Sequence, residues 1–351
     1  GWNHFLPLFR LLRSLSRVEE AMNIIVSSDT ILGIFFLFQF GIGFIGNTLL
    51  LMLNINTLFQ PSSKKPIDLI CTHLTLANIM TILSSVIPEI INAFGVRNFL
   101  DDIGCKAVLY IYRVTRGVSL CTTSFLSIFQ AIIITPSNSR WAWLKPKVST
   151  YLFPAFFSFW IINMLIYIRV IITAVGPYNI SEVGQVYSLT YCSGREPDKL
   201  QEAAFLGGMV LRDILCICLM IWTSMYMVNF LFIHRKTVQH VHRTSLCPRP
   251  SPETRATHTI LALVSCFVFF YWTNTCLTIY IIYRHNVQSL ENITIFLSSC
   301  YPAICPFVLI KNNNRRSFLN CNFAKTRKSS PQSMSLRGLN ALTNFFDTRA
   351  M

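Results

Sequence analysis

The chain has 351 residues, of which 52% are hydrophobic and 13% are charged, and its formal net charge is +15. With a mean hydropathy of +0.48, it has too few charged side chains to keep a water-soluble domain of this size in solution. Its Lys and Arg residues stand in short segments between long apolar runs, which is not the pattern of a nucleic-acid-binding protein. The composition predicts a protein embedded in a lipid bilayer, with no nucleic-acid partner.

Seven apolar runs are long enough to cross a bilayer as helices. A hydrocarbon core about 30 Å thick requires roughly 20 helical residues, because each residue rises about 1.5 Å and backbone polar groups must be satisfied internally in lipid. The predicted spans are residues 30–55, 67–94, 103–134, 148–172, 203–233, 257–283 and 293–310. The fold class predicted is an all-α membrane protein, a bundle of seven transmembrane helices.

The segments between the spans alternate between basic and acidic. The connections after the first, third and fifth spans carry the basic residues Lys64, Lys65, Arg140, Lys145, Lys147, Arg235, Lys236, Arg243, Arg249 and Arg255, and the segment after the seventh is also basic. The other connections carry the acids Asp101, Asp102, Glu182, Glu196, Asp198, Glu202 and Glu291. Because short cytoplasmic loops are enriched in Lys and Arg, we expect the N-terminus outside and the C-terminus in the cytoplasm.

This topology predicts three parts of the chain. They are an extracellular N-terminal segment at 1–29, a seven-span domain at 30–311 and a basic cytoplasmic tail at 312–351. Met22 lies just ahead of the first span, so residues 1–21 are expected to be upstream or added sequence.

The connection after the fourth span carries two marks of an extracellular position. Asn179 begins an Asn-Ile-Ser glycosylation sequon, and Cys192 follows in the same connection. Cys105, at the outer end of the third span, is the other cysteine best placed in an oxidising compartment. We predict a glycan on Asn179 and a disulfide between Cys105 and Cys192.

Three short motifs have a structural explanation that is simpler than a chemical one. The glycines at 41, 43 and 46 match G-x-G-x-x-G, but they lie inside an apolar helix, where small residues let another helix approach. Asn47 follows them and is expected to form an interhelical hydrogen bond. The histidines at 234, 240 and 242 lack acidic or thiolate partners at metal-ligand spacing, and no nucleophile is accompanied by a base. We therefore expect no enzyme activity, no metal and no cofactor.

Ionisable residues within the spans are the strongest functional signal, because each costs roughly 2.5–3.5 kcal/mol at the bilayer centre unless it is paired or hydrated. They are Glu89, Arg113, Arg116, Arg169, Arg212 and Asp213. In one interpretation these charges only tie helices together. In the other they also line an outward-opening ligand pocket, for which the candidate residues are Glu89, Tyr110, Tyr112, Arg113, Arg116 and Asp213, with Asp213 placed to meet Arg116.

Two cytoplasmic segments are candidates for interaction. Residues 234–256 are basic and contain three prolines, which suits a docking loop, although a plain linker has the same composition. In the tail, Cys321 beside apolar and basic residues is a weak candidate for palmitoylation.

Several segments together resemble the vomeronasal type-1 receptors, G-protein-coupled receptors for pheromones and related chemical signals. The matching segments are His73–Asn78, Cys105-Lys106, Arg113–Gly117, Cys121–Thr123, Phe129–Ala131, Asn138–Trp141, Tyr191-Cys192, His242–Thr257, Ser299–Pro302 and Pro306–Ile310. The run from His242 to Thr257 is long, polar and idiosyncratic, so a chance match is improbable. Glu89 departs from the family pattern, in which a neutral polar residue is usual.

The resemblance implies a small pheromone-like or odorant-like ligand, an inhibitory-class heterotrimeric G protein as partner, and the plasma membrane of a chemosensory neuron. Ligand would bind among the outer halves of spans two, three, five, six and seven. The candidates facing the G protein are Arg140, Arg235, Lys236, Arg243 and Arg255. The alternatives are a transporter or channel, for which no internal duplication is evident, and a receptor copy that does not signal.

Overall fold

The computed structural model describes residues 6–59, 66–96, 99–136, 139, 142–176, 185–188, 192–195, 199–241, 252–284 and 292–310. The described residues up to Val308 form one compact unit. Its helices are α1 (Leu6–Phe59), α2 (Pro66–Ala93), α3 (Asp102–Ile134), α4 (Leu144–Val148), α5 (Leu152–Thr173), α6 (Lys199–Val241) and α7 (Pro252–Arg284). A further helix, Asn292–Ile310, is called the 292–310 helix below.

The seven predicted spans are confirmed. Helices long and apolar enough to cross a membrane run over Asp29–Phe59, Pro66–Ala93, Asp102–Ile134, Leu152–Thr173, Ala203–Ile233, Thr257–Leu277 and Asn292–Ile310. The short α4 is not a span, so α5, α6 and α7 are the fourth, fifth and sixth. The largest difference from expectation is α1, which begins at Leu6 rather than near residue 30. Residues 8–29 contain no Gly or Pro that would end a helix, and Pro7 suits its first turn.

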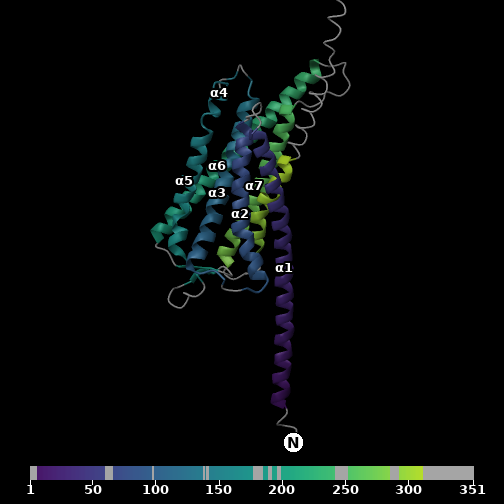
Figure 1. Cartoon of the computed structure of the whole chain (residues 1–351), viewed down its shortest axis with the longest axis vertical. Coiled ribbons are helices and arrows are strands. Elements are labelled where there is room, and N and C mark those ends of the chain that lie inside the picture. Colours follow the sequence, from purple (N-terminus) through teal and green to yellow (C-terminus); the bar gives the residue numbers. More distant parts are fainter. Residues whose placement is uncertain are drawn as a thin grey trace, which may run out of the picture. The chain divides into compact units, whose positions relative to one another are not determined.

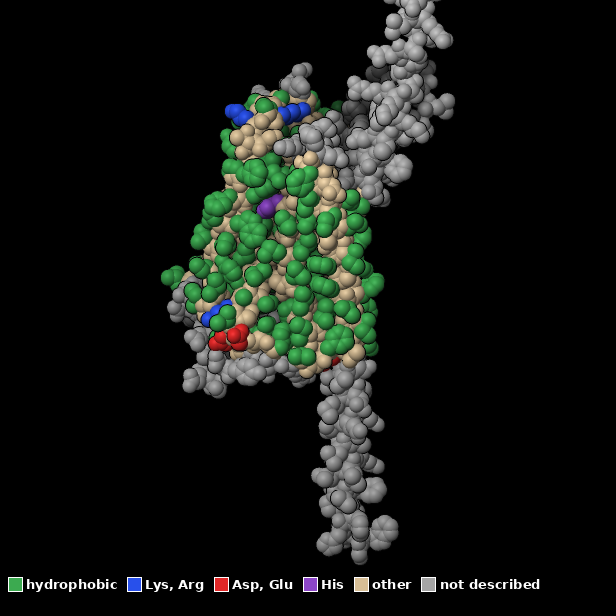
Figure 2. All heavy atoms as spheres, in the orientation of Figure 1, with side chains coloured by type: hydrophobic (Ala, Val, Ile, Leu, Met, Phe, Trp, Pro, Cys, Tyr) green, Lys and Arg blue, Asp and Glu red, His purple; other side chains and the backbone are tan. Residues whose placement is uncertain are grey.

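The flank of the bundle is apolar (Figure 2). Large side chains such as Phe38 and Phe157, both 69% exposed, and Trp222, 76% exposed, point outward from α1, α5 and α6. Exposed apolar surface of this extent is unfavourable in water and is what a helix bundle presents to lipid. Charged side chains gather instead at the two ends of the bundle, with Lys and Arg at the end that carries α4 and with both acidic and basic side chains at the other end.

Helix α3 is the centre of the bundle. It contacts α2, α5, α6 and α7, and 78% of its apolar window is buried, against 17% for α6. Small and hydroxyl-bearing residues, among them Gly117, Ser119, Thr122 and Thr123, are buried on α3 and allow these neighbours to approach closely. Figure 1 shows α3 between α2 and the α5–α6 side of the bundle.

Three short strands cover the end of α3 that begins at Asp102, an addition to the all-helical prediction. They are β1 (Ala174–Val175), β2 (Gln185–Ser188) and β3 (Ser193–Arg195), arranged antiparallel in the order β1-β3-β2. Cys192, which precedes β3, forms a disulfide with Cys105 of α3, and their Cα atoms lie 5.8 Å apart. This is the pair that the sequence predicted. We call this end of the bundle the disulfide end.

The first helix packs through glycines, as the sequence indicated. A Cβ atom at Gly43 would lie 2.8 Å from Ile82 Cδ1, and one at Gly46 would lie 3.0 Å from Pro306 Cγ, so both positions need glycine for close helix contact. Gly41 meets nothing within 4 Å. Asn47 donates hydrogen bonds to the carbonyls of Gly43 (2.7 Å) and Pro302 (2.8 Å), which confirms its interhelical role.

Candidate functional site

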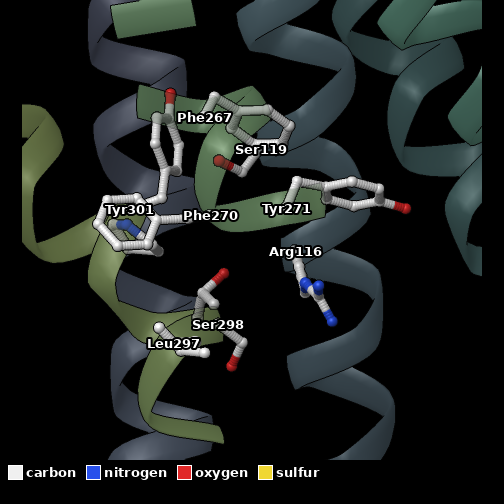
Figure 3. A pocket seen from close by; sticks show the side chains of 10 residues that line it. Arg116, Ser119, Phe267, Phe270, Tyr271, Leu297, Ser298 and Tyr301 are labelled. Carbon is white, nitrogen blue, oxygen red and sulfur yellow. The ribbon is translucent and has the colours of Figure 1, made fainter. Parts of the chain in front are cut away.

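A pocket opens near the middle of the bundle, where α2, α3, α7 and the 292–310 helix meet (Figure 3). Its lining combines hydroxyl groups, aromatic rings and one guanidinium group. The lining residues are Thr81, Arg116, Ser119, Phe267, Phe270, Tyr271, Leu297, Ser298, Tyr301 and Pro302. An apolar cavity with a few placed polar groups is the usual form of a small-molecule site. Its α3 residues Arg116 and Ser119 lie near the middle of that helix, whereas the sequence placed the ligand among the outer halves of the spans.

Arg116 is the charged residue of this lining. Its guanidinium carbon lies 5.5 Å from the centre of the Tyr271 ring, within the range of a cation–π contact. The partners of the Asn274 amide assign its oxygen and nitrogen: with the two atoms exchanged, the oxygen accepts from Arg116 Nη2 (2.6 Å) and the nitrogen donates to the Thr294 carbonyl (2.8 Å). Arg116 therefore links α3 to α7 and, through Asn274, to the 292–310 helix.

A second guanidinium lies on the side of α6 that faces α5. Arg212 donates to Asp213 Oδ1 from Nε (2.8 Å) and Nη2 (2.5 Å), to Asn163 Oδ1 (2.6 Å) and to the Tyr167 hydroxyl (3.0 Å). The side chains of Arg212 and Asp213 are 8% and 14% exposed. A charge pair this buried is tolerated only when further hydrogen bonds satisfy it, and Asn163 and Tyr167 of α5 supply them.

Asp213 connects the two groups. The Tyr271 hydroxyl donates to Asp213 Oδ2, and Arg116 interacts electrostatically with the same carboxylate. One network thus runs from α5 through Arg212 and Asp213 of α6 to Tyr271 of α7 and Arg116 of α3. The expected meeting of Asp213 with Arg116 occurs through the Tyr271 side chain. We call these residues, with Asn163, Tyr167 and Asn274, the charge network.

The other predicted pocket residues lie outside the lining, and one of them contacts it. The Tyr112 hydroxyl donates to Ser298 Oγ (2.9 Å), so Tyr112 supports one of the lining residues. Tyr110 faces α5 instead and donates to the Met164 carbonyl (3.1 Å). Glu89 is 2% exposed near the disulfide end of α2, and Arg113 is half-buried one turn from Arg116. Neither Glu89 nor Arg113 belongs to the lining.

Sequence reasoning missed the uncharged part of the pocket. Phe267, Phe270 and Tyr271 share one face of α7 because they are three and four residues apart, and Ser298 and Tyr301 share a face of the 292–310 helix in the same way. Such spacing was the available signal, but apolar and aromatic residues recur at helical spacing throughout the spans. Arg116 and Asp213 could be distinguished from the other residues of the spans only because they are charged.

Hydroxyl pairs tie the pocket helices to one another. The Tyr301 and Thr123 hydroxyls lie 2.8 Å apart, and the Tyr301 ring packs edge-on against Phe267 at 4.5 Å between centroids. Ser85 and Ser299 hydroxyls are 3.1 Å apart, which joins α2 to the 292–310 helix just beyond the lining. The walls of the pocket are therefore connected by side chains, not by backbone.

The predicted cytoplasmic candidates are only partly described. Lys236 is exposed on α6 with its ammonium group 4.5 Å from the centre of the Phe232 ring. The backbones of Arg235 and Arg255 lie in α6 and α7. Arg140, Arg243, Asn179 and Cys321 lie outside the described residues. Among the described residues, no three His, Cys, Asp or Glu side chains form a group suited to a metal.

A family profile and individual known proteins match this chain, and they indicate the same receptor family. The profile of the vomeronasal organ pheromone receptor family matches residues 30–320. Vomeronasal type-1 receptor 2 of Homo sapiens is 37% identical over 284 residues, which cover 81% of this chain and 72% of that protein. Vomeronasal type-1 receptor 4 of Homo sapiens is 39% identical over 244 residues, which cover 69% of this chain and 81% of that protein.

Among solved structures, squid rhodopsin superposes with a TM-score of 0.61 over 81% of both chains, at 15% sequence identity. At this identity the likeness concerns the fold alone, a bundle of seven transmembrane helices.

Proposed function

Because this chain belongs to the vomeronasal organ pheromone receptor family, we propose that it binds a small pheromone-like or odorant-like molecule and activates an inhibitory-class heterotrimeric G protein. Family and fold together make it a chemosensory G-protein-coupled receptor of the plasma membrane, and not an enzyme. The ligand, the class of G protein and the residues involved form the proposal argued below.

The observation that carries the proposal is the pocket around Arg116. It offers three aromatic rings from α7 and one from the 292–310 helix for an apolar body, with the Ser119 and Ser298 hydroxyls and the Arg116 guanidinium for a polar group. Specificity in such a site comes from the few polar groups, since apolar contact discriminates poorly among molecules of similar shape. We assign the polar end of the ligand to Arg116.

The cavity volume of about 20 Å³ bears on the mechanism. This volume admits water but not an odorant, because small-molecule pockets measure roughly 300–1,000 Å³. Ligand binding therefore requires side chains of α7 and the 292–310 helix to move apart. A ligand that binds the wider arrangement better shifts the protein toward it by the difference in binding free energy.

The charge network gives this movement a route to the other end of the bundle. Tyr271 both lines the pocket and donates to Asp213, so displacement of Tyr271 alters the tie between α6 and α7. Both helices continue beyond their membrane spans, α6 to Val241 and α7 back to Pro252. We assign G-protein contact to this end, with Lys236, Arg235 and Arg255 on these helices and Arg140 and Arg243 in the connecting segments.

The proposed orientation places the disulfide end outside the cell and the α4 end in the cytoplasm. Lys145 and Lys147 lie in the last turn of α4, as the excess of basic residues in cytoplasmic loops requires. The disulfide at the opposite end suits an oxidising compartment. Chemosensory neurons are the proposed location.

The primary test is ligand-dependent nucleotide exchange by an inhibitory-class G protein co-reconstituted with the receptor in lipid vesicles. A chemical panel of volatile and amphipathic molecules supplies the ligands. We expect at least one compound to accelerate exchange in receptor vesicles and not in empty ones. No acceleration across the panel, or compound-driven ion flux without G protein, would contradict the proposal.

The pocket assignment is tested by Arg116→Gln against Arg113→Gln, a matched change one turn away on the same helix. Loss of a hydrogen bond to a charged group costs about 1.5–3 kcal/mol, which corresponds to roughly 10- to 150-fold in ligand potency. We expect that loss for Arg116→Gln at unchanged surface expression, and a smaller one for Arg113→Gln. Equal potency losses in the two variants would remove Arg116 from the role of polar anchor.

A further inference from the structure

Two thiols meet inside the bundle, away from the pocket lining. Cys121 of α3 and Cys216 of α6 have their Sγ atoms 3.9 Å apart, and the two residues are 7% and 9% exposed. Asn163 of α5 donates its amide N–H to Cys121 Sγ (3.7 Å). The charge network and this thiol pair therefore share Asn163, which also accepts a hydrogen bond from Arg212.

Helical spacing places each thiol one turn from a residue at the charge network. Gly117 and Cys121 are four residues apart on α3, and Arg212 and Cys216 are four apart on α6, so each pair lies on one face of its helix. Gly117 leaves the space that Asn163 and Arg212 fill, and Ser124 donates to the Cys216 carbonyl (3.2 Å) on the other side. Close approach of α3 and α6 on both sides of the thiols holds them in contact.

We propose that Cys121 and Cys216 are a redox modification site, at which a hydroperoxide converts the two thiols into a disulfide that joins α3 to α6. In the first step the Cys121 thiolate attacks one oxygen of the peroxide, so an S–O bond forms and the O–O bond breaks. With hydrogen peroxide, the other oxygen leaves as hydroxide and takes up the proton that the Cys121 thiol lost, which gives water. In the second step the Cys216 sulfur attacks the resulting sulfenic acid, an S–S bond replaces the S–O bond, and a second water carries away the oxygen.

The surroundings select Cys121 as the sulfur that reacts first. Its Sγ accepts the Cys216 S–H and the Asn163 N–H, and the Arg212 guanidinium is bound to the same Asn163 side chain. Hydrogen-bond donors and a nearby cation stabilise a thiolate, which is the reactive form of cysteine. Cys216, the donor of the pair, is in contact and serves as the resolving thiol.

The consequence for signalling rests on the proposed function. A covalent tie between α3 and α6 beside Arg212 and Asp213 holds the part of α6 that must shift when Tyr271 is displaced. The oxidised receptor is then fixed in one arrangement of α3 and α6, so ligand binding can no longer shift it to the second arrangement. Oxidation would therefore act as a reversible off-switch, restored by thiol reductants.

The first measurement is a peptide map of the full-length receptor in lipid nanodiscs after treatment with dilute hydrogen peroxide. Remaining thiols are alkylated and the protein is digested without reduction. We expect a linked Cys121–Cys216 peptide that is lost in Cys121→Ser and in Cys216→Ser, and retained in Cys218→Ser. Cys218 is the matched control because it lies exposed on the same helix two residues away. Recovery of Cys121 and Cys216 as separately alkylated thiols would overturn the proposal.

The second measurement distinguishes this proposal from the proposed function. Thermal unfolding needs no ligand or G protein, and peroxide should raise the unfolding midpoint of the receptor and of Cys218→Ser but not of Cys121→Ser. With a compound from the panel, peroxide should abolish G-protein nucleotide exchange in the receptor and spare it in Cys121→Ser. If the linked peptide forms but neither the unfolding midpoint nor G-protein nucleotide exchange changes, the disulfide does not fix the arrangement of α3 and α6, and this part of the proposal is overturned. If no compound stimulates nucleotide exchange in the untreated receptor, the proposed function is contradicted. The peptide map and the unfolding midpoint would still show whether Cys121 and Cys216 form a disulfide.

Discussion

Gly117 shows how one residue on α3 determines what its neighbours can do. A Cβ atom at this position would collide with Asn163 Oδ1 and come within 2.5 Å of Arg212 Nη1. Only hydrogen leaves room for the buried guanidinium and its amide partner between α3, α5 and α6. The charge network therefore depends on a residue that has no side chain and carries no charge.

Gly117→Ala should destabilise the receptor, whereas Gly41→Ala should not. Forcing an extra methyl group into a packed site costs about 1–3 kcal/mol, but a Cβ at Gly41 meets nothing within 4 Å. Alanine also favours helix over glycine by about 1 kcal/mol, so Gly41→Ala should be neutral or slightly stabilising. Unfolding midpoints of the two purified variants check this. Equal midpoints would show that the network has room for a methyl group.

At the scale of elements, α3 holds the bundle together through hydroxyl and amide groups. Ser119 donates to Asn78 Oδ1 of α2 (2.7 Å), and the Ser127 hydroxyl lies 2.6 Å from that of Thr223 of α6. Lipid gives helices no hydrophobic reason to associate, so close packing and interhelical hydrogen bonds take that role. This explains why the most buried of the seven described spans carries many Ser and Thr residues.

The tie between α3 and the 292–310 helix can be measured by a double-mutant cycle with Thr123→Val and Tyr301→Phe. Thr123 donates its proton to the Ser119 carbonyl (2.8 Å), so Tyr301 is the donor to Thr123. Both changes keep the shape of the side chain. We expect a coupling free energy of about 0.6 kcal/mol, with an upper limit near 1.7 kcal/mol. Strict additivity of the two unfolding free energies would show that the hydroxyl pair contributes nothing.

At the scale of the whole molecule, the two ends of the bundle differ chemically. One end carries the Cys105–Cys192 disulfide and the three-stranded sheet, and there Asp102 Oδ1 accepts from the Gly176 backbone N–H (2.5 Å). The other carries α4 with Lys145 and Lys147. This asymmetry supports the proposed orientation, and a glycan on Asn179, in the connection that leads to Cys192, would mark the outer face.

Orientation is tested by removing separately two glycosylation sequons, Asn179-Ile-Ser and Asn292-Ile-Thr. Asn179→Gln should abolish a glycan-dependent shift in gel mobility, because the sequon lies in the connection proposed to be outside. Asn292→Gln is the matched control and should leave the mobility unchanged, since Asn292 begins a membrane span. An antibody against a C-terminal epitope should stain only permeabilised cells. Staining of intact cells, or no glycan at Asn179, would reverse or refute this topology.

The predictable part of the candidate site consisted of residues that are unusual for their surroundings. Arg116 and Asp213 stood out because charge is rare within membrane spans. Tyr271 and Phe267, which complete the site, are ordinary residues of an apolar helix until their neighbours are known. Glu89 was selected by the same reasoning as Arg116, and Tyr110 because it lies near these charges in the sequence, yet both lie outside the pocket lining.

The sequence by itself determined the seven spans and the pairing of Cys105 with Cys192. Hydropathy is a sum over a local window. A long apolar segment in a bilayer forms a spanning helix that satisfies its own backbone hydrogen bonds, so the spans can be predicted without knowing their neighbours. Only the tertiary structure decided which charges meet, that Tyr271 joins Asp213 and that Cys121 touches Cys216. Those contacts depend on the rotation and relative height of each helix, which side-chain packing between distant segments sets and no local window records.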